Sequence, residues 1–192
     1  MNNSNKQDEE VGLVNRLLRC LGHIEADPIG GDRPDIIVSI DNRKVGVEVT
    51  QFHSDEGHIQ TSVGSHARAR EVKLSKLAPG RPYSVWGNPD PNPGIIARIT
   101  DKIARAESYD TTNYSELWLL VTTGIPRLGA VASTFAFPDF VSIKSLNDST
   151  DEILVTSNFA RVYIHMHLPA ALFLWTRHTS WHRLDTRDRS DA

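Results

Sequence analysis

Two short runs rich in β-branched residues, joined by one polar pair, constrain the fold of this chain more than any other feature. The runs are residues 36–40 and 43–49, and the joining pair is Asp41-Asn42. β-Branched residues favour strands, and a two-residue polar link favours a tight reversal of the backbone. The stretch therefore predicts a β-hairpin.

The hairpin register brings two acidic residues together. With a two-residue loop, Ile40 pairs with Arg43, and continuing the register places Asp35 directly opposite Glu48. Opposed side chains on antiparallel strands have Cβ atoms about 4.5–5.5 Å apart, so two carboxylates there need a proton or a cation between them. Mg²⁺ or Mn²⁺ suits such oxygen ligands. In the alternative interpretation, Asp35 caps the strand and Glu48 lies on a solvated face.

The residues Pro34-Asp35, a short hairpin and then Glu48-Val49-Thr50 resemble the PD-(D/E)XK motif of the restriction-endonuclease-like nucleases. The resemblance implies an α/β core of helix, three-strand meander, helix and strand with a mixed central sheet, here followed by additional C-terminal strands. It also implies that Asp35, Glu48 and the Val49 carbonyl bind Mg²⁺ or Mn²⁺, and that the substrate is a nucleic acid, with DNA favoured. Thr50 stands where the motif has its lysine, which some members carry on a neighbouring helix or replace.

Lys102 is the first candidate to substitute for that lysine. It borders the apolar stripe of a helix predicted over residues 95–107, so its ammonium could reach the carboxylates. The alternative is a lysine that simply extends to solvent. Lys73 and Lys44 are weaker candidates than Lys102. Lys44 lies four residues before Glu48, about 13 Å away along an extended strand, which is too far for direct chemistry.

Other polar residues could contribute to the same site. Nucleases of this kind often carry an acidic residue on the first helix near the metal, and Glu10 or Glu9 could take that place in a helix predicted over residues 8–21. In the alternative, both are ordinary acids near a helix N-terminus, where the dipole favours them. Thr50 and Gln51 are possible accessory residues, and Gln51 or His53 could line the rim of the site.

A cationic helix predicted over residues 65–77 is the candidate for phosphate contact. Its basic side chains include Arg68, Arg70, Lys73 and Lys76. Neutralising phosphates with such side chains is the main source of affinity for nucleic acids. A solvated helix face is an equal alternative, since Glu71 also lies on this segment.

Two further classes of function remain open. Thr50 would also suit a nuclease-like scaffold that has lost its lysine and serves as a binding or interaction module. A metal-dependent hydrolase could instead be built on His53 and His58, although their spacing matches no strong zinc pattern.

Composition narrows the class of protein. A length of 192 residues predicts a single domain, and a net charge of −3 gives no overall basic signature, so any nucleic-acid contact needs a local patch. The lone Cys20 excludes an intramolecular disulfide and suits a cytoplasmic protein. No apolar run reaches the length of a membrane span, and a homodimer remains open.

The remaining segments complete the predicted outline. We expect disorder in residues 1–7 and 187–192, an irregular Pro-rich loop over 78–94, and loops over 124–151. The apolar run at 117–121 predicts a central strand. Further strands are predicted at 23–26, 161–167, 172–175 and 181–184.

Overall fold

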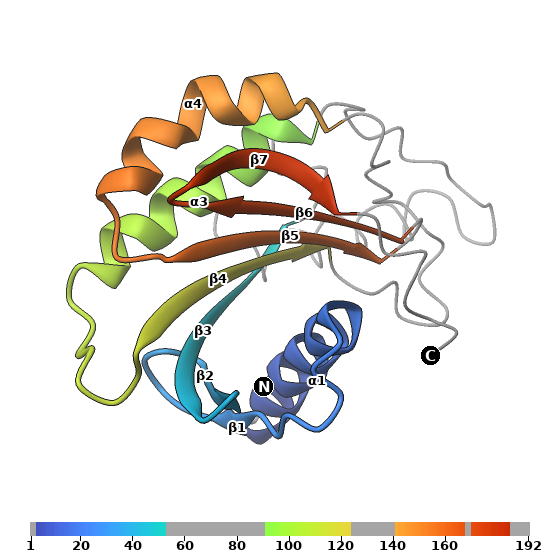
Figure 1. The fold of residues 1–192 in the computed structure, drawn as a ribbon, viewed down its shortest axis with the longest axis vertical. Helices are drawn as coiled ribbons and strands as arrows, with labels where there is room; N and C mark the ends of the chain where they lie inside the picture. The colour runs from blue at the N-terminus through green and yellow to red at the C-terminus, as the bar shows by residue number, and fades with distance from the viewer. Residues whose placement is uncertain (1–2, 53–90, 124–140, 168–169, 185–192) are drawn as a thin grey trace, which may run out of the picture.

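A seven-stranded mixed sheet with helices on both faces forms the described part of the chain (Figure 1). The computed structural model describes residues 3–52, 91–123, 141–167 and 170–184. The helices are α1 (Asn3–Leu21), α3 (Asn92–Ala106) and α4 (Ile143–Thr156). The strands are β1 (Ile29–Gly30), β2 (Ile36–Ile40), β3 (Arg43–Phe52), β4 (Glu116–Thr123), β5 (Arg161–His167), β6 (Ala170–Thr176) and β7 (Thr179–Leu184). The predicted α/β class with a mixed sheet is confirmed.

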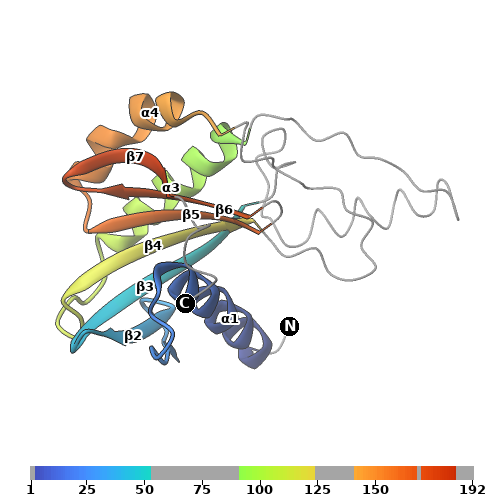
Figure 2. The ribbon, with the colours of Figure 1, turned by 45° about the vertical axis from the view of Figure 1, so that its right-hand side comes forward.

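The strands lie side by side in sequence order, and their directions explain the layers. β1, β2 and β3 form an antiparallel meander, β3, β4 and β5 run parallel, and β6 and β7 return antiparallel. The two parallel connections require crossovers, and these contain α3 and α4. Because both crossovers step the same way across the sheet and such connections are right-handed, α3 and α4 share one face, with α1 on the other (Figures 1 and 2).

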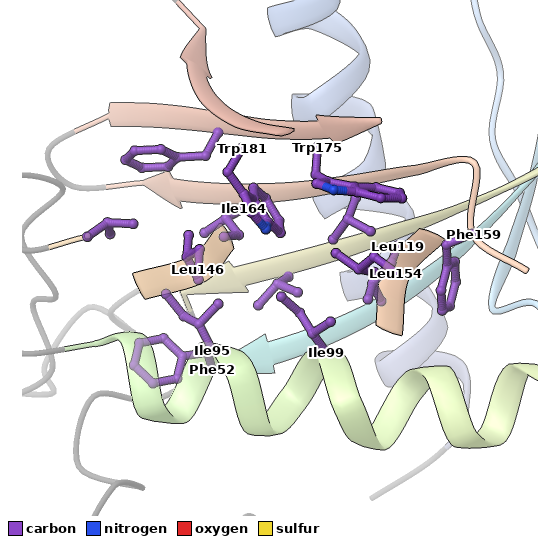
Figure 3. Close-up of a cluster of buried hydrophobic side chains, with 14 of the residues drawn as sticks. Phe52, Ile95, Ile99, Leu119, Leu146, Leu154, Phe159, Ile164, Trp175 and Trp181 are labelled. Atoms are coloured by element: carbon purple, nitrogen blue, oxygen red, sulfur yellow. The ribbon is translucent and has the colours of Figure 1, made fainter. Parts of the chain in front are cut away.

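Each face of the sheet has its own apolar cluster. On the side of α3 and α4, buried residues such as Ile99 and Leu146 pack against Leu119 of β4 (Figure 3). On the side of α1, Leu17 belongs to a second cluster with Leu120 of β4. Neighbouring β4 residues thus point to opposite faces and are both buried, which explains the continuous apolar run that predicted this central strand.

The hairpin between β2 and β3 has the predicted register. Ile40 pairs with Arg43, and the ladder extends back to the pair of Ile36 with Val47. Asp41 and Asn42 form the two-residue loop with φ of 49° and 63°. Both lie in the left-handed region that a type I′ turn requires and that Asp and Asn tolerate.

The N-terminal part of the chain departs from the predictions in two places. α1 begins at Asn3, so the expected disorder is wrong for residues 3–7. The predicted strand at 23–26 is also wrong, because the end of α1 turns the chain there. Gly22 has a φ of 85°, and the His23 N–H bonds the Leu18 carbonyl at 2.8 Å, the pattern of a Schellman cap.

The helix predicted over residues 95–107 is confirmed as α3 but begins earlier, and a second helix, α4, occupies a segment that was predicted to be loops. α3 begins at Asn92, inside the predicted 78–94 loop, because a proline fits the first turn of a helix and Pro93 lies there. α4 occupies most of the second half of the 124–151 segment, and the Ser142 hydroxyl caps it by accepting from the Ser145 N–H at 3.1 Å.

The C-terminal strands follow the predictions. β5 and β6 form the expected antiparallel pair, and β7 is the expected final strand. The predictions for residues 1–2, 53–90, 124–140 and 187–192 lie outside the described residues. Within the described residues, no helix has both the length and the apolar character needed to cross a membrane.

Candidate functional site

Asp35 lies immediately before β2, and its carboxylate extends the hairpin ladder by one hydrogen bond. Oδ2 accepts from the Val49 N–H at 2.9 Å. If the hairpin register is continued beyond the pair of Ile36 with Val47, the residue opposite Val49 is Pro34. Proline has no N–H to donate to the Val49 carbonyl. The Val49 carbonyl therefore faces the end of the β2 ladder, where Pro34 cannot bond it and a cation could.

Glu48 projects from β3 toward α3 and is only 4 % exposed. Its Oε1 lies 2.5 Å from the Nζ of Lys102, whose side chain is 14 % exposed. Oε2 is also buried and accepts no well-formed hydrogen bond from the described residues. The alternative that Glu48 lies on a solvated face is therefore wrong. A buried carboxylate oxygen without a donor is costly, and a proton, a water or a cation would relieve that cost.

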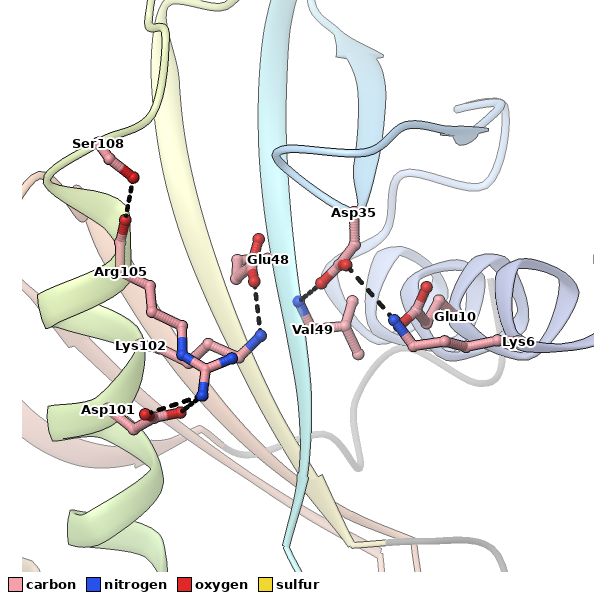
Figure 4. A network of polar contacts seen from close by, with 9 residues as sticks. All are labelled: Lys6, Glu10, Asp35, Glu48, Val49, Asp101, Lys102, Arg105 and Ser108. Carbon is pink, nitrogen blue, oxygen red and sulfur yellow. Dashed lines mark hydrogen bonds and ion pairs between the residues drawn. The ribbon is translucent and has the colours of Figure 1, made fainter. Parts of the chain in front are cut away.

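The two carboxylates interact electrostatically without facing each other squarely. Burial first, and then the Glu48 charge, raise the pKa of Asp35 to about 6, against the opposing effect of the Val49 N–H. Figure 4 shows Glu48 on the α3 side of β3 and Asp35 toward α1. Asp35 therefore bonds the strand edge through the Val49 N–H while Glu48 bonds Lys102, and the sharing of one cation by the two carboxylates stays a prediction.

α1 brings a third carboxylate and a second ammonium to the site. Lys6 Nζ lies 2.9 Å from Glu10 Oε1 and 3.9 Å from Asp35 Oδ1 (Figure 4). The hydrogen bond to Glu10 is the main cause that raises the pKa of Lys6. Lys6 was missed because α1 was expected to begin later. The signal in the sequence was the i, i+4 spacing of Lys6 and Glu10.

Other candidate residues have different positions. Thr50 is buried on the same face of β3 as Glu48, at the motif's lysine position. Gln51 donates to the Glu9 carboxylate at 2.9 Å and so ties β3 to α1. Arg68, Arg70, Lys73, Lys76, His53 and His58 lie outside the described residues.

Tyr109 is a second residue that the sequence reasoning missed. It follows α3, packs against the apolar cluster beneath that helix, and its hydroxyl lies beside the Glu48 carboxylate. Burial first, and then the charge of Glu48 and a hydrogen bond to it, raise the pKa of Tyr109. The Tyr109 hydroxyl lies too poorly aligned to satisfy Oε2 of Glu48, which still accepts no well-formed hydrogen bond. The raised pKa keeps this hydroxyl protonated. No pattern in the sequence identified this role.

The donor set suits a hard divalent cation. Asp35, Glu48 and the Val49 carbonyl offer oxygen ligands, and Mg²⁺ is commonly held by one or two carboxylates with water completing its shell. The orphaned Oε2 of Glu48 and the raised pKa of Asp35 both indicate a place where added positive charge is favourable. Among the described residues, no three His, Cys, Asp or Glu side chains form a metal cluster by themselves.

No protein-family model matches the sequence, and neither the curated proteins nor the solved structures give a significant match. Fold and site geometry therefore define the class: an α/β protein with a buried carboxylate–ammonium pair beside a second carboxylate at the start of a β-hairpin. Any assignment of activity depends on that geometry and on the motif residues alone.

Proposed function

We propose that this chain is a Mg²⁺- or Mn²⁺-dependent nuclease that hydrolyses phosphodiester bonds, with DNA as the favoured substrate. The observation that carries the proposal is the buried Glu48–Lys102 pair next to Asp35, whose pKa is raised to about 6. Strongly perturbed carboxylates with a specific charged partner are typical of functional sites.

The arrangement of elements supports the same proposal. Along the chain, α1 precedes the β1–β2–β3 meander, and α3 then leads to β4, which pairs parallel to β3. This order is the one that the resemblance to restriction-endonuclease-like nucleases implies. The single cysteine suits a cytoplasmic location for such an enzyme.

Each residue of the site has a distinct role in the proposed reaction. Asp35, Glu48 and the Val49 carbonyl would hold the cation. When bound, Mg²⁺ supplies charge neutralisation at the phosphate and lowers the pKa of water. Lys102 would orient the attacking water and stabilise the charge that develops on the phosphate, the part the motif's lysine otherwise takes.

A binding module without catalysis is the second candidate. Thr50 and the mutual neutralisation of Glu48 and Lys102 favour it, because an ion pair already satisfies one of the two carboxylates. Such a protein would bind its partner with or without Mg²⁺, whereas a nuclease needs the cation for cleavage.

A metal-titrated cleavage assay on single- and double-stranded DNA tests the proposal. We expect Mg²⁺-dependent cleavage by the wild type and a loss of about 100-fold or more in Asp35→Asn, because even the residues that only support metal ligands contribute about 10- to 100-fold. Lys144→Gln removes a lysine that is 86 % exposed on α4 and serves as the matched control with unchanged activity. Metal-dependent cleavage that persists in Asp35→Asn, or no cleavage by the wild type with either metal, would refute it.

A further inference from the structure

We infer, building on the proposed function, that Lys6 occupies the cation position beside Asp35 in the metal-free protein and sets the affinity for a divalent ion by competing with it. Its ammonium lies between Glu10 and Asp35, at 2.9 Å and 3.9 Å. An ammonium and a metal cation satisfy the same carboxylate oxygens, and both cannot do so at one time.

The exposure of the two lysine side chains indicates which ammonium leaves the site when a divalent cation binds. The side chain of Lys102 is 14 % exposed, and its partner Glu48 is 5 % exposed. The side chain of Lys6 is 68 % exposed. The carboxylates that Lys6 contacts, Glu10 and Asp35, are only 12 % and 13 % exposed, so they need another cation when the ammonium of Lys6 leaves them. The ammonium of Lys6 itself lies near solvent, whereas that of Lys102 is enclosed with its partner. Lys6 can therefore swing into solvent when a divalent cation replaces it, while Lys102 stays with the site.

The charge count of the site favours this exchange. Three carboxylates, Glu10, Asp35 and Glu48, face two ammonium groups, which leaves one negative charge in excess. When Lys6 departs, two negative charges are uncompensated, and a divalent cation balances them. Charges this close interact through an effective dielectric lower than that of water, so the net charge of the site affects the affinity for a divalent cation.

The position of Lys6 in α1 allows the movement. Lys6 is the fourth residue of a helix that begins at Asn3, and its contact with Glu10 is an i, i+4 pair within that helix. Releasing such a pair costs the helix little, since pairs of this kind contribute only weakly. Figure 4 shows the long side chain reaching from α1 toward Asp35, so a change of side-chain rotamer suffices to withdraw it.

Mn²⁺ binding to the full-length protein, measured by electron paramagnetic resonance without substrate, tests the inference. We expect Lys6→Gln to bind Mn²⁺ about two- to fivefold more tightly than the wild type, because the competing ammonium is itself exposed and its ion pairs are weak. Lys6→Arg keeps the charge and should stay near the wild-type affinity. Lys144→Gln, which breaks an exposed i, i+4 pair far along the chain, should leave the affinity unchanged.

The outcomes separate this inference from the proposed function. Unchanged or weaker Mn²⁺ binding in Lys6→Gln would overturn the competing role of Lys6. If Asp35→Asn still abolishes wild-type binding in that case, the proposed metal site stands. Wild-type binding that is absent, or insensitive to Asp35→Asn, would overturn the inference together with the metal site on which it rests.

Discussion

Lys102 Nζ lies 2.5 Å from Glu48 Oε1, although the two residues are 54 positions apart in the chain. The contact joins α3 to β3 beneath the surface, with both side chains largely buried. Buried ion pairs add little net stability compared with apolar residues of similar size. The fold therefore gains little stability from the pair over apolar residues, which is compatible with the role of Lys102 in the proposed metal site.

Removing the ammonium alone should be costly. Lys102→Met leaves Glu48 charged and unpaired, and we expect it to lower the free energy of unfolding at pH 8 by about 3–5 kcal/mol. Urea denaturation measures this change. The double variant Lys102→Met with Glu48→Gln should recover much of the loss. A single-variant loss no larger than that of Lys144→Met, which breaks an exposed pair, would contradict the account.

Asp35 should make the stability of the metal-free protein depend on pH. Its pKa, raised to about 6, lies above the unfolded value of about 3.9, so its stabilising contribution is complete below pH 4 and is lost as the pH rises through 6. Asn cannot ionise but can still accept from the Val49 N–H. We expect Asp35→Asn in EDTA to raise the free energy of unfolding by about 2 kcal/mol at pH 8 and by little at pH 4.

Adding Mg²⁺ to the wild type and to Asp35→Asn provides a control for the stability measurements in EDTA. Ligands that bind only the folded state stabilise it, so Mg²⁺ at pH 8 should raise the melting temperature of the wild type and not of Asp35→Asn. Equal stability of the two proteins across the pH range in EDTA would show that the Asp35 carboxyl has an ordinary pKa.

A side chain at Gly46 should destabilise the fold, because Gly46 packs against Pro34, the residue that precedes Asp35. A Cβ there would lie 2.6 Å from Pro34 Cγ and 3.2 Å from the Tyr114 ring. We expect Gly46→Ala to destabilise the fold by about 1–3 kcal/mol, as overpacking does, and to weaken Mn²⁺ binding by displacing Asp35.

Gly12 offers the matched control for that substitution. A Cβ on this α1 glycine meets no atom within 4 Å. Gly12→Ala should therefore stabilise the protein by about 0.5–1 kcal/mol through helix propensity, without affecting Mn²⁺ binding. Thermal melts of both variants measure these changes in stability. A Gly46→Ala protein as stable as Gly12→Ala would contradict the close packing of Gly46 against Pro34 and Tyr114.

The sequence predicted the local elements better than the way side chains meet across them. The register of the hairpin followed from Asp41-Asn42 because turn chemistry is local. The contact of Lys102 with Glu48 was anticipated as one that Lys102 could make from its place beside an apolar stripe. The closeness of this contact, and the side of β3 on which Glu48 lies in Figure 4, depend on tertiary packing that no spacing reveals.

The residues that were missed have the same explanation. α1 was expected to begin after Lys6, so this residue was never considered as a partner of Asp35. Tyr109 reaches Glu48 from the segment that follows α3, so this contact depends on how the crossover packs and not on the local sequence. α4 was not predicted because most of its residues are polar and its buried stripe, which includes Leu146 and Leu154, is short.

Crystals of the protein soaked with Mn²⁺ test the central claim most directly, through the anomalous signal of the ion. The account predicts one peak bonded to Asp35, Glu48 and the Val49 carbonyl at about 2.1–2.2 Å, with the Lys6 ammonium withdrawn from Asp35. No peak at this position, or a peak bonded to only one of the two carboxylates, would contradict the proposed metal site.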